Sequence, residues 1–181
     1  GIPIVIDADN GYGNAINVVR TVREFEHAGV AGIHLEDQTW PKRCGHMLGK
    51  ALIPKEEMCK KLQAAQDARE DKDFVIIARC DAMLVNGLDD VLDRCNAYVE
   101  AGADMLFCEV RESMDEIEAV AREFKDKVPL HWNHSPSPMV PRLSAEQVEA
   151  LGFKTCCFYV QSLMAAAKTM QEVLAEIRES G

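Results

Sequence analysis

Acidic side chains gather at the ends of two apolar runs near the start of the chain. Asp7 and Asp9 close the run 2–8, and Glu36 follows the run 31–35. Because side chains alternate along a strand, Asp7 and Asp9 are expected to share a face. Three carboxylates at one place repel each other unless a cation lies among them. These residue types favour a hard divalent cation, and a polar strand end that caps a turn is the alternative.

The segment from Lys42 to His46 has the sharpest pattern, Lys-Arg-Cys-Gly-His. A thiol flanked by two cations and a histidine is expected to ionise readily, which suits an acid, a base or a nucleophile. Gly45 and the nearby Gly49 give the segment the freedom to move as a lid. A basic solvated loop with an incidental Cys44 is the alternative. A zinc site is disfavoured, because further Cys or His residues at ligand spacing are lacking nearby.

Two further strand ends carry groups that bind anions. Arg79 follows the run 74–78 and either holds a carboxylate bidentately or pairs with the nearby Asp81 as a structural salt bridge. The segment 133–137 has the sequence Asn-His-Ser-Pro-Ser, whose amide and hydroxyl donors suit anion recognition, although the same residues are common in turns. His34 is expected to be a packing or solvated residue rather than a ligand.

Composition limits the classes of partner. Thirty acidic residues against twenty basic ones give a net charge of −10, which argues against a nucleic-acid partner because phosphate binding needs a basic face. No apolar run approaches the roughly 18 residues of a membrane helix, and acids interrupt the only apolar N-terminal stretch, so neither a membrane span nor a signal peptide is expected. Seven cysteines without a CxxC pair favour a reducing compartment, and the expected location is cytoplasmic or an organelle matrix.

The elements that must position these residues alternate between short apolar runs and longer amphipathic stretches. The runs expected to be strands are 2–8, 31–35, 74–78, 103–108, 128–132 and 155–160. The stretches expected to be helices are 15–25, 54–70, 88–101, 113–124, a short helix after Ser144, and 162–177. Pro54 is expected at the first helical position, and Ser113 with Glu116 and Ser144 with Gln147 are expected to cap helices.

The runs are continuous rather than alternating, which is typical of strands buried on both faces of a parallel sheet. Repeated strand–helix units predict an α/β fold, either a doubly wound sheet or a (β/α)8 barrel. Chemically active residues follow nearly every strand, and that convergence favours the barrel. Because a barrel needs more strands than the six expected here, either two N-terminal strands are missing or the sheet is open. Residues 1–181 are expected to form a single domain.

Three of these segments resemble motifs of the isocitrate lyase/phosphoenolpyruvate mutase superfamily. The matching segments are Asp7-Ala8-Asp9-Asn10-Gly11-Tyr12-Gly13, His34-Leu35-Glu36-Asp37-Gln38 and Pro41-Lys42-Arg43-Cys44-Gly45-His46. Their order and spacing fit over essentially the whole chain, and the Lys-Arg-Cys-Gly-His element resembles the lyases of the superfamily. The resemblance implies a (β/α)8 TIM-type barrel, truncated at its N-terminus with about six β/α units present. It also implies a homotetramer that exchanges helices between subunits.

The resemblance implies roles for individual residues. Asp7, Asp9 and Glu36 would bind Mg²⁺, or Mn²⁺ in its place, partly through waters. Cys44 would be the acid/base partner of the succinate-like half of the substrate, on a loop that closes over the site, with His46 in support. Arg79 completes the catalytic set. The residues expected to bind the carboxylic acid substrate are Lys42, Arg43, Gly45, Arg79, Asn133, Ser135 and Ser137.

The implied reaction is retro-aldol cleavage of a 2-hydroxy tricarboxylate, isocitrate or 2-methylisocitrate, to succinate and glyoxylate or pyruvate. The Lys-Arg-Cys form resembles the methylisocitrate branch, whereas the segment 133–137 resembles the isocitrate branch. Asp9 stands where long isocitrate lyases have Glu. Two alternatives stay open. One is hydrolysis of oxaloacetate or another C–C or P–C cleavage on the same scaffold, and the other is an inactive partial barrel that acts only in assembly.

Overall fold

Six parallel strands form one sheet in the computed structural model, which describes residues 1–44, 47–110, 113–137 and 140–181. The strands are β1 (Val5–Asp7), β2 (Gly32–Glu36), β3 (Val75–Cys80), β4 (Met105–Cys108), β5 (Leu130–Asn133) and β6 (Thr155–Cys157). Each strand pairs with the next one along the chain, in the order β1-β2-β3-β4-β5-β6. A doubly wound sheet reverses its strand order at a switch point, so this unbroken order is that of a barrel.

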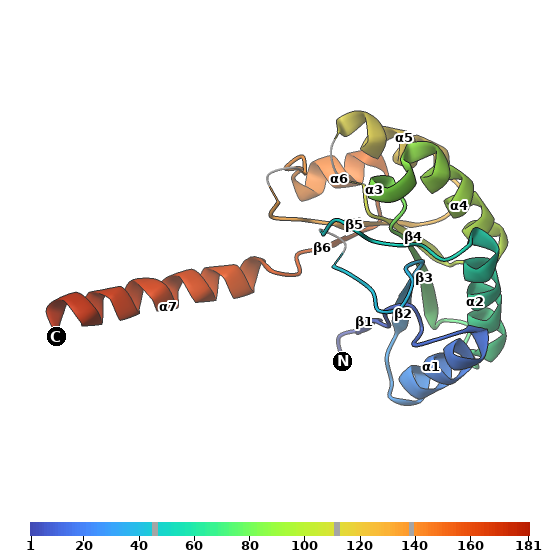
Figure 1. Ribbon diagram of the computed structural model, residues 1–181, viewed down its shortest axis with the longest axis horizontal. Helices are drawn as coiled ribbons and strands as arrows, with labels where there is room; N and C mark the ends of the chain where they lie inside the picture. The colour runs from blue at the N-terminus through green and yellow to red at the C-terminus, as the bar shows by residue number, and fades with distance from the viewer. Residues whose placement is uncertain (45–46, 111–112, 138–139) are drawn as a thin grey trace.

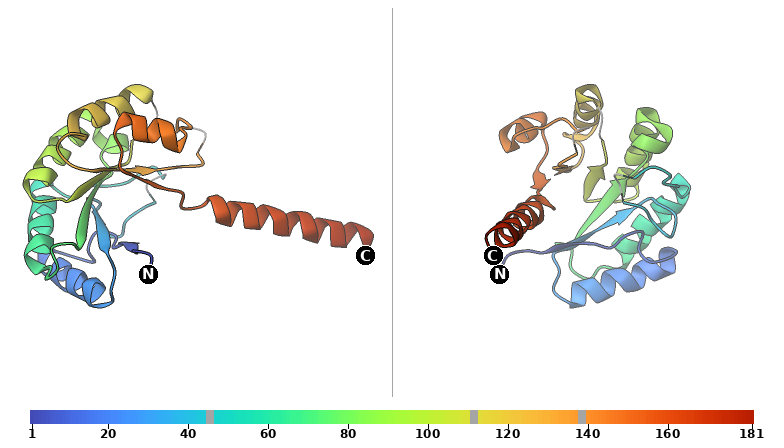
Figure 2. Two further views of the ribbon diagram at one scale, coloured as in Figure 1. Left: turned by 180° about the vertical axis from the view of Figure 1, so that it is seen from behind. Right: turned by 60° about the vertical axis from the view of Figure 1, so that its left-hand side comes forward.

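The sheet curls, and helices cover its convex side (Figures 1 and 2). The helices between the strands are α1 (Ala15–His27), α2 (Lys55–Ala68), α3 (Met83–Asn86), α4 (Leu88–Glu100), α5 (Met114–Phe124) and α6 (Ala145–Leu151). β1 and β6 each pair on one side only among the described strands, so the architecture is a six-stranded half-barrel. The predicted α/β class is therefore confirmed, while closure into eight strands and truncation at the N-terminus stay predictions.

Alternate residues of each strand point to opposite faces of the sheet, and the two faces differ in character. Ile33, Leu35 and Leu106 are fully buried and belong to the core cluster that the helices complete. Burying an aliphatic side chain of this size contributes about 1.5–3 kcal/mol. The alternate residues of the strands, such as Glu36 in β2 and Arg79 in β3, extend to the concave face. The core thus lies under the helices, and the concave face carries the polar groups.

The expectation that every strand is buried on both faces is confirmed for the middle of the sheet and wrong at its edges. β3 is buried along almost its whole length. Val5 in β1 is 51% exposed, and Ile2 and Ile4 before it are also exposed. An edge strand has a neighbour on one side only, so it loses half of its cover. The two edge strands are also shorter than predicted, at 5–7 and 155–157.

Side-chain caps start the later helices as the sequence predicts. Ser144 and Gln147 form a reciprocal capping box at α6, and the Ser113 hydroxyl accepts the backbone N–H of Glu116 at α5. Pro54 precedes α2 as its N-cap rather than being its first helical residue. α3 was not predicted, because a helix of four residues is too short to show a helical period.

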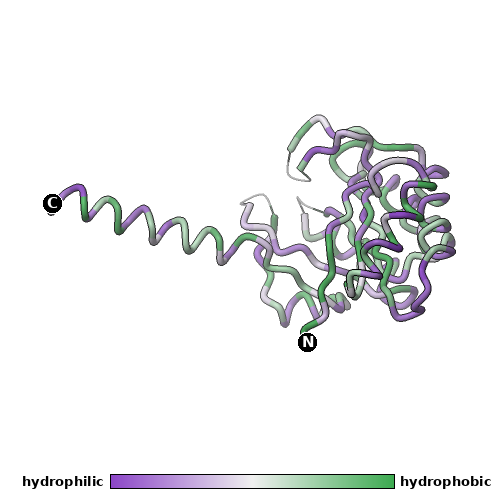
Figure 3. The backbone as a smooth tube through the Cα atoms, turned by 90° about the horizontal axis from the view of Figure 1, so that it is seen from below, coloured by the Kyte–Doolittle hydropathy of each residue, from purple (hydrophilic) through white to green (hydrophobic). Residues whose placement is uncertain are grey.

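The last helix, α7 (Gln161–Ser180), projects away from the half-barrel (Figures 1 and 2). None of its residues is buried by the described chain, and Leu163, Met170, Leu174 and Ile177 are each more than half exposed. Hydrophobic and hydrophilic residues alternate along it (Figure 3). Among the described residues, no helix combines the length and the apolar character that crossing a membrane requires.

Candidate active site

The carboxyl ends of the strands and the loops after them surround a cavity of about 510 Å³. Strand register brings side chains from four strands side by side, because Glu36 pairs with Arg79, Arg79 with Phe107, and Phe107 with His131. The described residues that line the cavity are Val5, Asp7, His34, Lys42, Cys44, Arg79, Phe107, Glu109, His131, Asn133, Cys157 and Tyr159. Five residues predicted for the site are among them, namely Asp7, Lys42, Cys44, Arg79 and Asn133, so the structure brings these five to one cavity.

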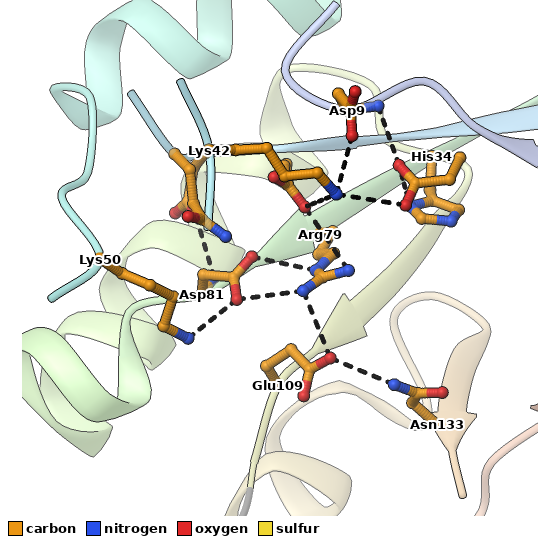
Figure 4. A network of polar contacts seen from close by, with 12 residues as sticks. Asp9, His34, Lys42, Lys50, Arg79, Asp81, Glu109 and Asn133 are labelled. Atoms are coloured by element: carbon orange, nitrogen blue, oxygen red, sulfur yellow. Dashed lines mark hydrogen bonds and ion pairs between the residues drawn. The ribbon is translucent and has the colours of Figure 1, made fainter. Parts of the chain in front are cut away.

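The carboxylates of Asp7, Asp9 and Glu36, here the acid cluster, converge on the ammonium of Lys42. Figure 4 labels Lys42 and Asp9 and marks the ion pair between them. Lys42 Nζ lies 2.7 Å from Asp9 Oδ1, 3.5 Å from Asp7 Oδ2 and 3.7 Å from Glu36 Oε2. The three acids do lie together, but the strand alternation that predicted this was wrong. β1 ends at Asp7, and Asp9 follows in a left-handed turn with φ +48°.

Burial and charge together set the protonation of this group. Burial raises the pKa of Glu36 to about 7, because the opposing charges of Arg79 and Lys42 offset only part of the desolvation. Burial also lowers the pKa of Lys42, but the hydrogen bond to Asp9 and the charges of Glu36 and Asp7 outweigh it, so the pKa rises. Lys42 is therefore a charged ammonium that neutralises part of the acid cluster.

The donor set of the acid cluster fits a hard divalent cation. Both carboxylate oxygens of Glu36 are buried, and neither makes a hydrogen bond within the described part of the chain. Carboxylate oxygens are the ligands that Mg²⁺ and Mn²⁺ prefer. In the same described part, however, no three His, Cys, Asp or Glu side chains form a ready set of ligands. The ammonium of Lys42 lies where the three acids converge.

Arg79 is held by three carboxylates at the wall of the cavity. Its Nε and Nη2 atoms donate to the two oxygens of Asp81 at 2.9 and 3.2 Å, and its guanidinium lies 3.5 Å from Glu36 and 3.4 Å from Glu109. Burial lowers the pKa of Arg79, but these three charges outweigh the burial and raise it. The structural salt bridge is thus present, and the capture of a substrate carboxylate by Arg79 stays a prediction.

A buried network behind the wall fixes the end of β2 to the end of β3. The carboxylate of Asp37 is fully buried and accepts the backbone N–H of Asp81 at 2.9 Å and the hydroxyl of Tyr98 at 2.7 Å. The guanidinium of Arg94 lies 3.4 Å from the same carboxylate. Burial raises the pKa of Asp37, and the bonds from Asp81 and Tyr98 act against that rise. The network positions Glu36 because Glu36 directly precedes Asp37.

Two cations and a phenol that were not predicted from the sequence complete this support. Lys50 is buried and donates to Asp81 Oδ1 at 2.9 Å, and Arg94 and Tyr98 come from α4. For Asp81, burial raises the pKa, but the charges of Arg79 and Lys50 outweigh the burial and lower it. The one available signal was the spacing of Arg94 and Tyr98, which places them on one face of a helix.

The loop that carries Cys44, residues 38–52 and here the thiol loop, is closed at its base. The side chain of Gln38 bonds the backbone of Arg43 twice, donating to its carbonyl and accepting its N–H, both at 3.0 Å. Gln38 also forms an isolated bridge with Leu52 at the other end of the loop. These bonds hold the backbone on either side of the loop in place.

The residues predicted on the thiol loop divide into those at the cavity and those elsewhere. Lys42 and the exposed Cys44 line the cavity. Arg43 directs its guanidinium to a backbone carbonyl within the loop, at 3.4 Å, and is not among the described lining residues. Gly45 and His46 lie outside the described residues, so their roles stay predictions.

The predicted anion-binding segment after β5 is only partly at the cavity. Asn133 lines the cavity, and its Nδ2 donates to Glu109 Oε1 at 3.2 Å. Ser135 is buried, and its hydroxyl accepts the backbone N–H of Ser137 at 3.1 Å and lies 3.5 Å from the hydroxyl of Tyr159. Neither serine belongs to the described cavity wall. Asn133 is thus the member of the segment that is placed to meet a ligand there.

A row of rings that sequence analysis left out of the site completes the wall. Phe107 lies edge-on between His34 and His131, with centroid distances of 5.7 and 5.0 Å. His34 packs as expected, but it also lines the cavity, and its Nδ1 lies 3.7 Å from Asp7 Oδ1. Burial lowers the pKa of His131 to about 4, so its imidazole is neutral near pH 7. Their alternate positions on paired strands were the signal that could have found them.

Comparison with known proteins places the chain among a group of related enzymes. The family model described as phosphoenolpyruvate phosphomutase matches residues 1–178. The chain is 45% identical over 180 residues to the 2-methylisocitrate lyase of Aeropyrum pernix, an alignment that covers 99% of this chain and 57% of that protein. It is 42% identical over 180 residues to the 2,3-dimethylmalate lyase of Eubacterium barkeri, with 98% and 61% covered. The chain thus spans less than two thirds of the length of these relatives.

Solved structures show the same arrangement of strands and helices. An oxaloacetate acetylhydrolase in complex with 3,3-difluorooxalacetate matches with a TM-score of 0.92 at 34% identity, over 98% of this chain and 60% of that one. A 2,3-dimethylmalate lyase matches with a TM-score of 0.91 at 34% identity, over 98% and 59%. A phosphonopyruvate hydrolase in complex with oxalate and Mg²⁺ matches with a TM-score of 0.85 at 36% identity, over 99% and 62%. The half-barrel therefore corresponds to a part of each of these structures.

Proposed function

Because the chain belongs to the phosphoenolpyruvate mutase/isocitrate lyase superfamily, we propose that its cavity is part of the active site of a carbon–carbon lyase for 2-methylisocitrate. The reaction is retro-aldol cleavage to succinate and pyruvate, and isocitrate, which gives glyoxylate, is the alternative substrate. The observation that carries the proposal is a single cavity wall that holds Asp7 of the acid cluster, Arg79 and an exposed thiol.

The side chains of this wall match the needs of retro-aldol cleavage. The substrate hydroxyl loses its proton to water, the freed electron pair forms the carbonyl of the 2-oxoacid as the adjacent C–C bond breaks, and the succinate half is left as a carbanion. A Mg²⁺ or Mn²⁺ ion held by the acid cluster would supply the charge that polarises the hydroxyl and the forming 2-oxo group. Cys44, which is exposed at the cavity, would donate the proton that completes succinate. Arg79 and Asn133 would orient the substrate carboxylates.

Cys44 is also what favours a lyase over the other activities of this fold. An oxaloacetate acetylhydrolase and a phosphonopyruvate hydrolase have similar structures, so the fold alone does not select the reaction. Hydrolysis also leaves a carbanion that must be protonated, but it needs in addition a water positioned to attack the substrate. The lyase is favoured because the Lys-Arg-Cys-Gly-His element resembles the lyases of the superfamily. In an inactive assembly module a fully buried Glu36 would only cost stability, because Arg79 and Lys42 offset only part of its desolvation.

Product analysis tests the proposed activity. The protein is incubated with Mg²⁺ and, separately, 2-methylisocitrate, isocitrate, 2,3-dimethylmalate and oxaloacetate, and the released 2-oxoacids, succinate and oxalate are quantified. Equal amounts of pyruvate and succinate from 2-methylisocitrate are expected. Oxalate from oxaloacetate without any lyase product would assign the hydrolase instead. No product from any of the four acids would favour the assembly module.

Self-association belongs to the same proposal. The resemblance to the superfamily implies a homotetramer with helix exchange, and the exposed apolar side chains of α7 support it. Contiguous apolar patches on soluble proteins commonly mark interaction surfaces. Sedimentation velocity at several concentrations is expected to show a species of four chains. A single-chain species throughout the concentration range would contradict this part of the proposal.

A further inference from the structure

One lysine occupies the centre of the acid cluster and also faces the cavity. Lys42 Nζ lies 2.7 Å from Asp9 and within 3.7 Å of Asp7 and Glu36 (Figure 4). The side chain of Lys42 is 25% exposed, and Lys42 lines the cavity together with Cys44. The same ammonium is therefore in reach of the acids and of any ligand that enters the cavity.

A divalent cation and this ammonium compete for the same oxygens of the acid cluster. The two oxygens of Glu36 are buried without a hydrogen bond in the described structure, and the cations nearest to them in its ion pairs are Lys42 at 3.7 Å and Arg79 at 3.5 Å. A divalent ion bound by the same carboxylates would lie within a few ångströms of the ammonium. Two cations at that separation repel each other, and both would need the same carboxylate oxygens. Binding of the divalent ion therefore requires the ammonium to leave.

We propose that Lys42 is a resident counter-ion of the acid cluster that the divalent cation displaces, so that metal binding turns the ammonium toward the cavity. The inference rests on the proposed function, because it assumes that the acid cluster binds the metal. Lys42 is thus a positioning residue, whose charge stabilises three neighbouring acids before the metal arrives. After displacement its ammonium is available to a carboxylate in the cavity, which makes metal binding precede productive substrate binding.

The backbone around Lys42 permits this exchange. Gln38 holds both the N–H and the carbonyl of Arg43, the next residue, at 3.0 Å. The base of the thiol loop is also tied by the bridge between Gln38 and Leu52. None of these bonds involves the side chain of Lys42. Rotation of that side chain is therefore sufficient, and the loop does not have to unfold.

Competition with the ammonium lowers the apparent affinity for the metal. The apparent affinity is the intrinsic affinity multiplied by the fraction of molecules in which Lys42 has left the cluster. If the ammonium holds its place in at least about nine molecules of ten, its removal tightens metal binding by about tenfold or more. Lys42→Met keeps the length of the side chain and removes the charge. Lys55→Met is the matched control, because Lys55 pairs with Asp93 at 2.6 Å and is not among the described residues of the cavity wall.

Calorimetric titration of Mn²⁺ alone into the metal-free chain measures this effect for the wild type and both variants. The Kd for Mn²⁺ is expected to fall by about tenfold or more in Lys42→Met and to stay unchanged in Lys55→Met. Equal or weaker binding by Lys42→Met, with the wild type still binding, overturns the inference and leaves the proposed function standing. No Mn²⁺ binding by any of the three proteins overturns the proposed function and this inference with it.

Limited proteolysis of the wild type decides the matter even if Lys42→Met does not fold. Trypsin must take a lysine side chain into its specificity pocket, so Lys42 resists cleavage while the acid cluster holds it. Addition of Mn²⁺ is expected to increase cleavage after Lys42 severalfold relative to cleavage after Lys72, which is exposed in the turn between α2 and β3. Mass spectrometry identifies the cut sites. Unchanged or slower cleavage after Lys42 would overturn the displacement.

Discussion

Replacing Tyr98 with Phe removes one buried hydroxyl and leaves the ring in place. The hydroxyl donates a 2.7 Å hydrogen bond to the fully buried carboxylate of Asp37 and accepts one from Arg94 at 3.3 Å. A hydrogen bond to a charged group contributes about 1.5–3 kcal/mol to the free energy of unfolding. Because Arg94 still faces Asp37 in the variant, the expected loss is about 2 kcal/mol. For a chain of this length, that loss lowers Tm by about 4–8 °C.

Urea unfolding monitored by circular dichroism measures the loss for Tyr98→Phe against Tyr12→Phe. Tyr12 is 47% exposed, so removal of its hydroxyl is expected to change the free energy of unfolding by less than about 0.5 kcal/mol. The difference between the two variants isolates the buried bond to Asp37. A loss below about 0.5 kcal/mol for Tyr98→Phe would mean that Asp37 does not depend on Tyr98, and that the proposed support of the β2 end is wrong.

Three further changes test other parts of the site. Cys44→Ser is expected to lower turnover by about 10²- to 10⁴-fold. The urea midpoint is expected to stay unchanged, because the thiol is exposed. Unchanged turnover in steady-state kinetics would refute the role of Cys44 as an acid. Asp81→Asn is expected to flatten the acid limb of the stability curve. Burial raises the pKa of Asp81, but Arg79 and Lys50 lower it below 3.8, so its stabilisation is full above the unfolded pKa and is lost as the pH falls through the folded pKa. Urea midpoints between about pH 6 and about pH 2 measure this, and equal slopes for the wild type and the variant would contradict it. Mg²⁺ at one hundred times its Kd is expected to stabilise the wild type by about 2.7 kcal/mol and so to raise its Tm. Asp9→Asn is expected to abolish this rise in Tm. A rise of the same size in the variant would exclude Asp9 as a ligand.

Local sequence patterns were sufficient to predict the fold class and the gathering of acids. Short apolar runs alternate with amphipathic stretches, and this period alone predicts strands that pair in parallel through helical crossovers. Parallel strands end at the same edge of the sheet, so Asp7 and Glu36 had to lie close together. The prediction that the acids gather depends on the direction of the strands and not on the face to which a side chain points. It therefore holds even though Asp9 lies in a turn and not in β1.

Contacts between distant segments could not be predicted from local patterns. Tyr98 and Asp37 are 61 residues apart, and Lys50 and Asp81 are 31 apart, so no periodic signal connects them. The position of Lys42 was missed for a different reason. Lys42 carries a charge that suits either the acids or a substrate, and only the packed structure decides between them. Exposure of β1 and β6 likewise depends on which strands have neighbours.

The anomalous difference density of crystals grown with Mn²⁺ tests the metal site most directly. A single strong peak among the Asp7, Asp9 and Glu36 carboxylates is expected, held by them directly or through bound waters, with the Lys42 ammonium moved away from them and Cys44 facing the same cavity. Density that keeps the ammonium among the three acids at saturating Mn²⁺, or a peak at another place, would contradict a divalent-cation site beside the thiol.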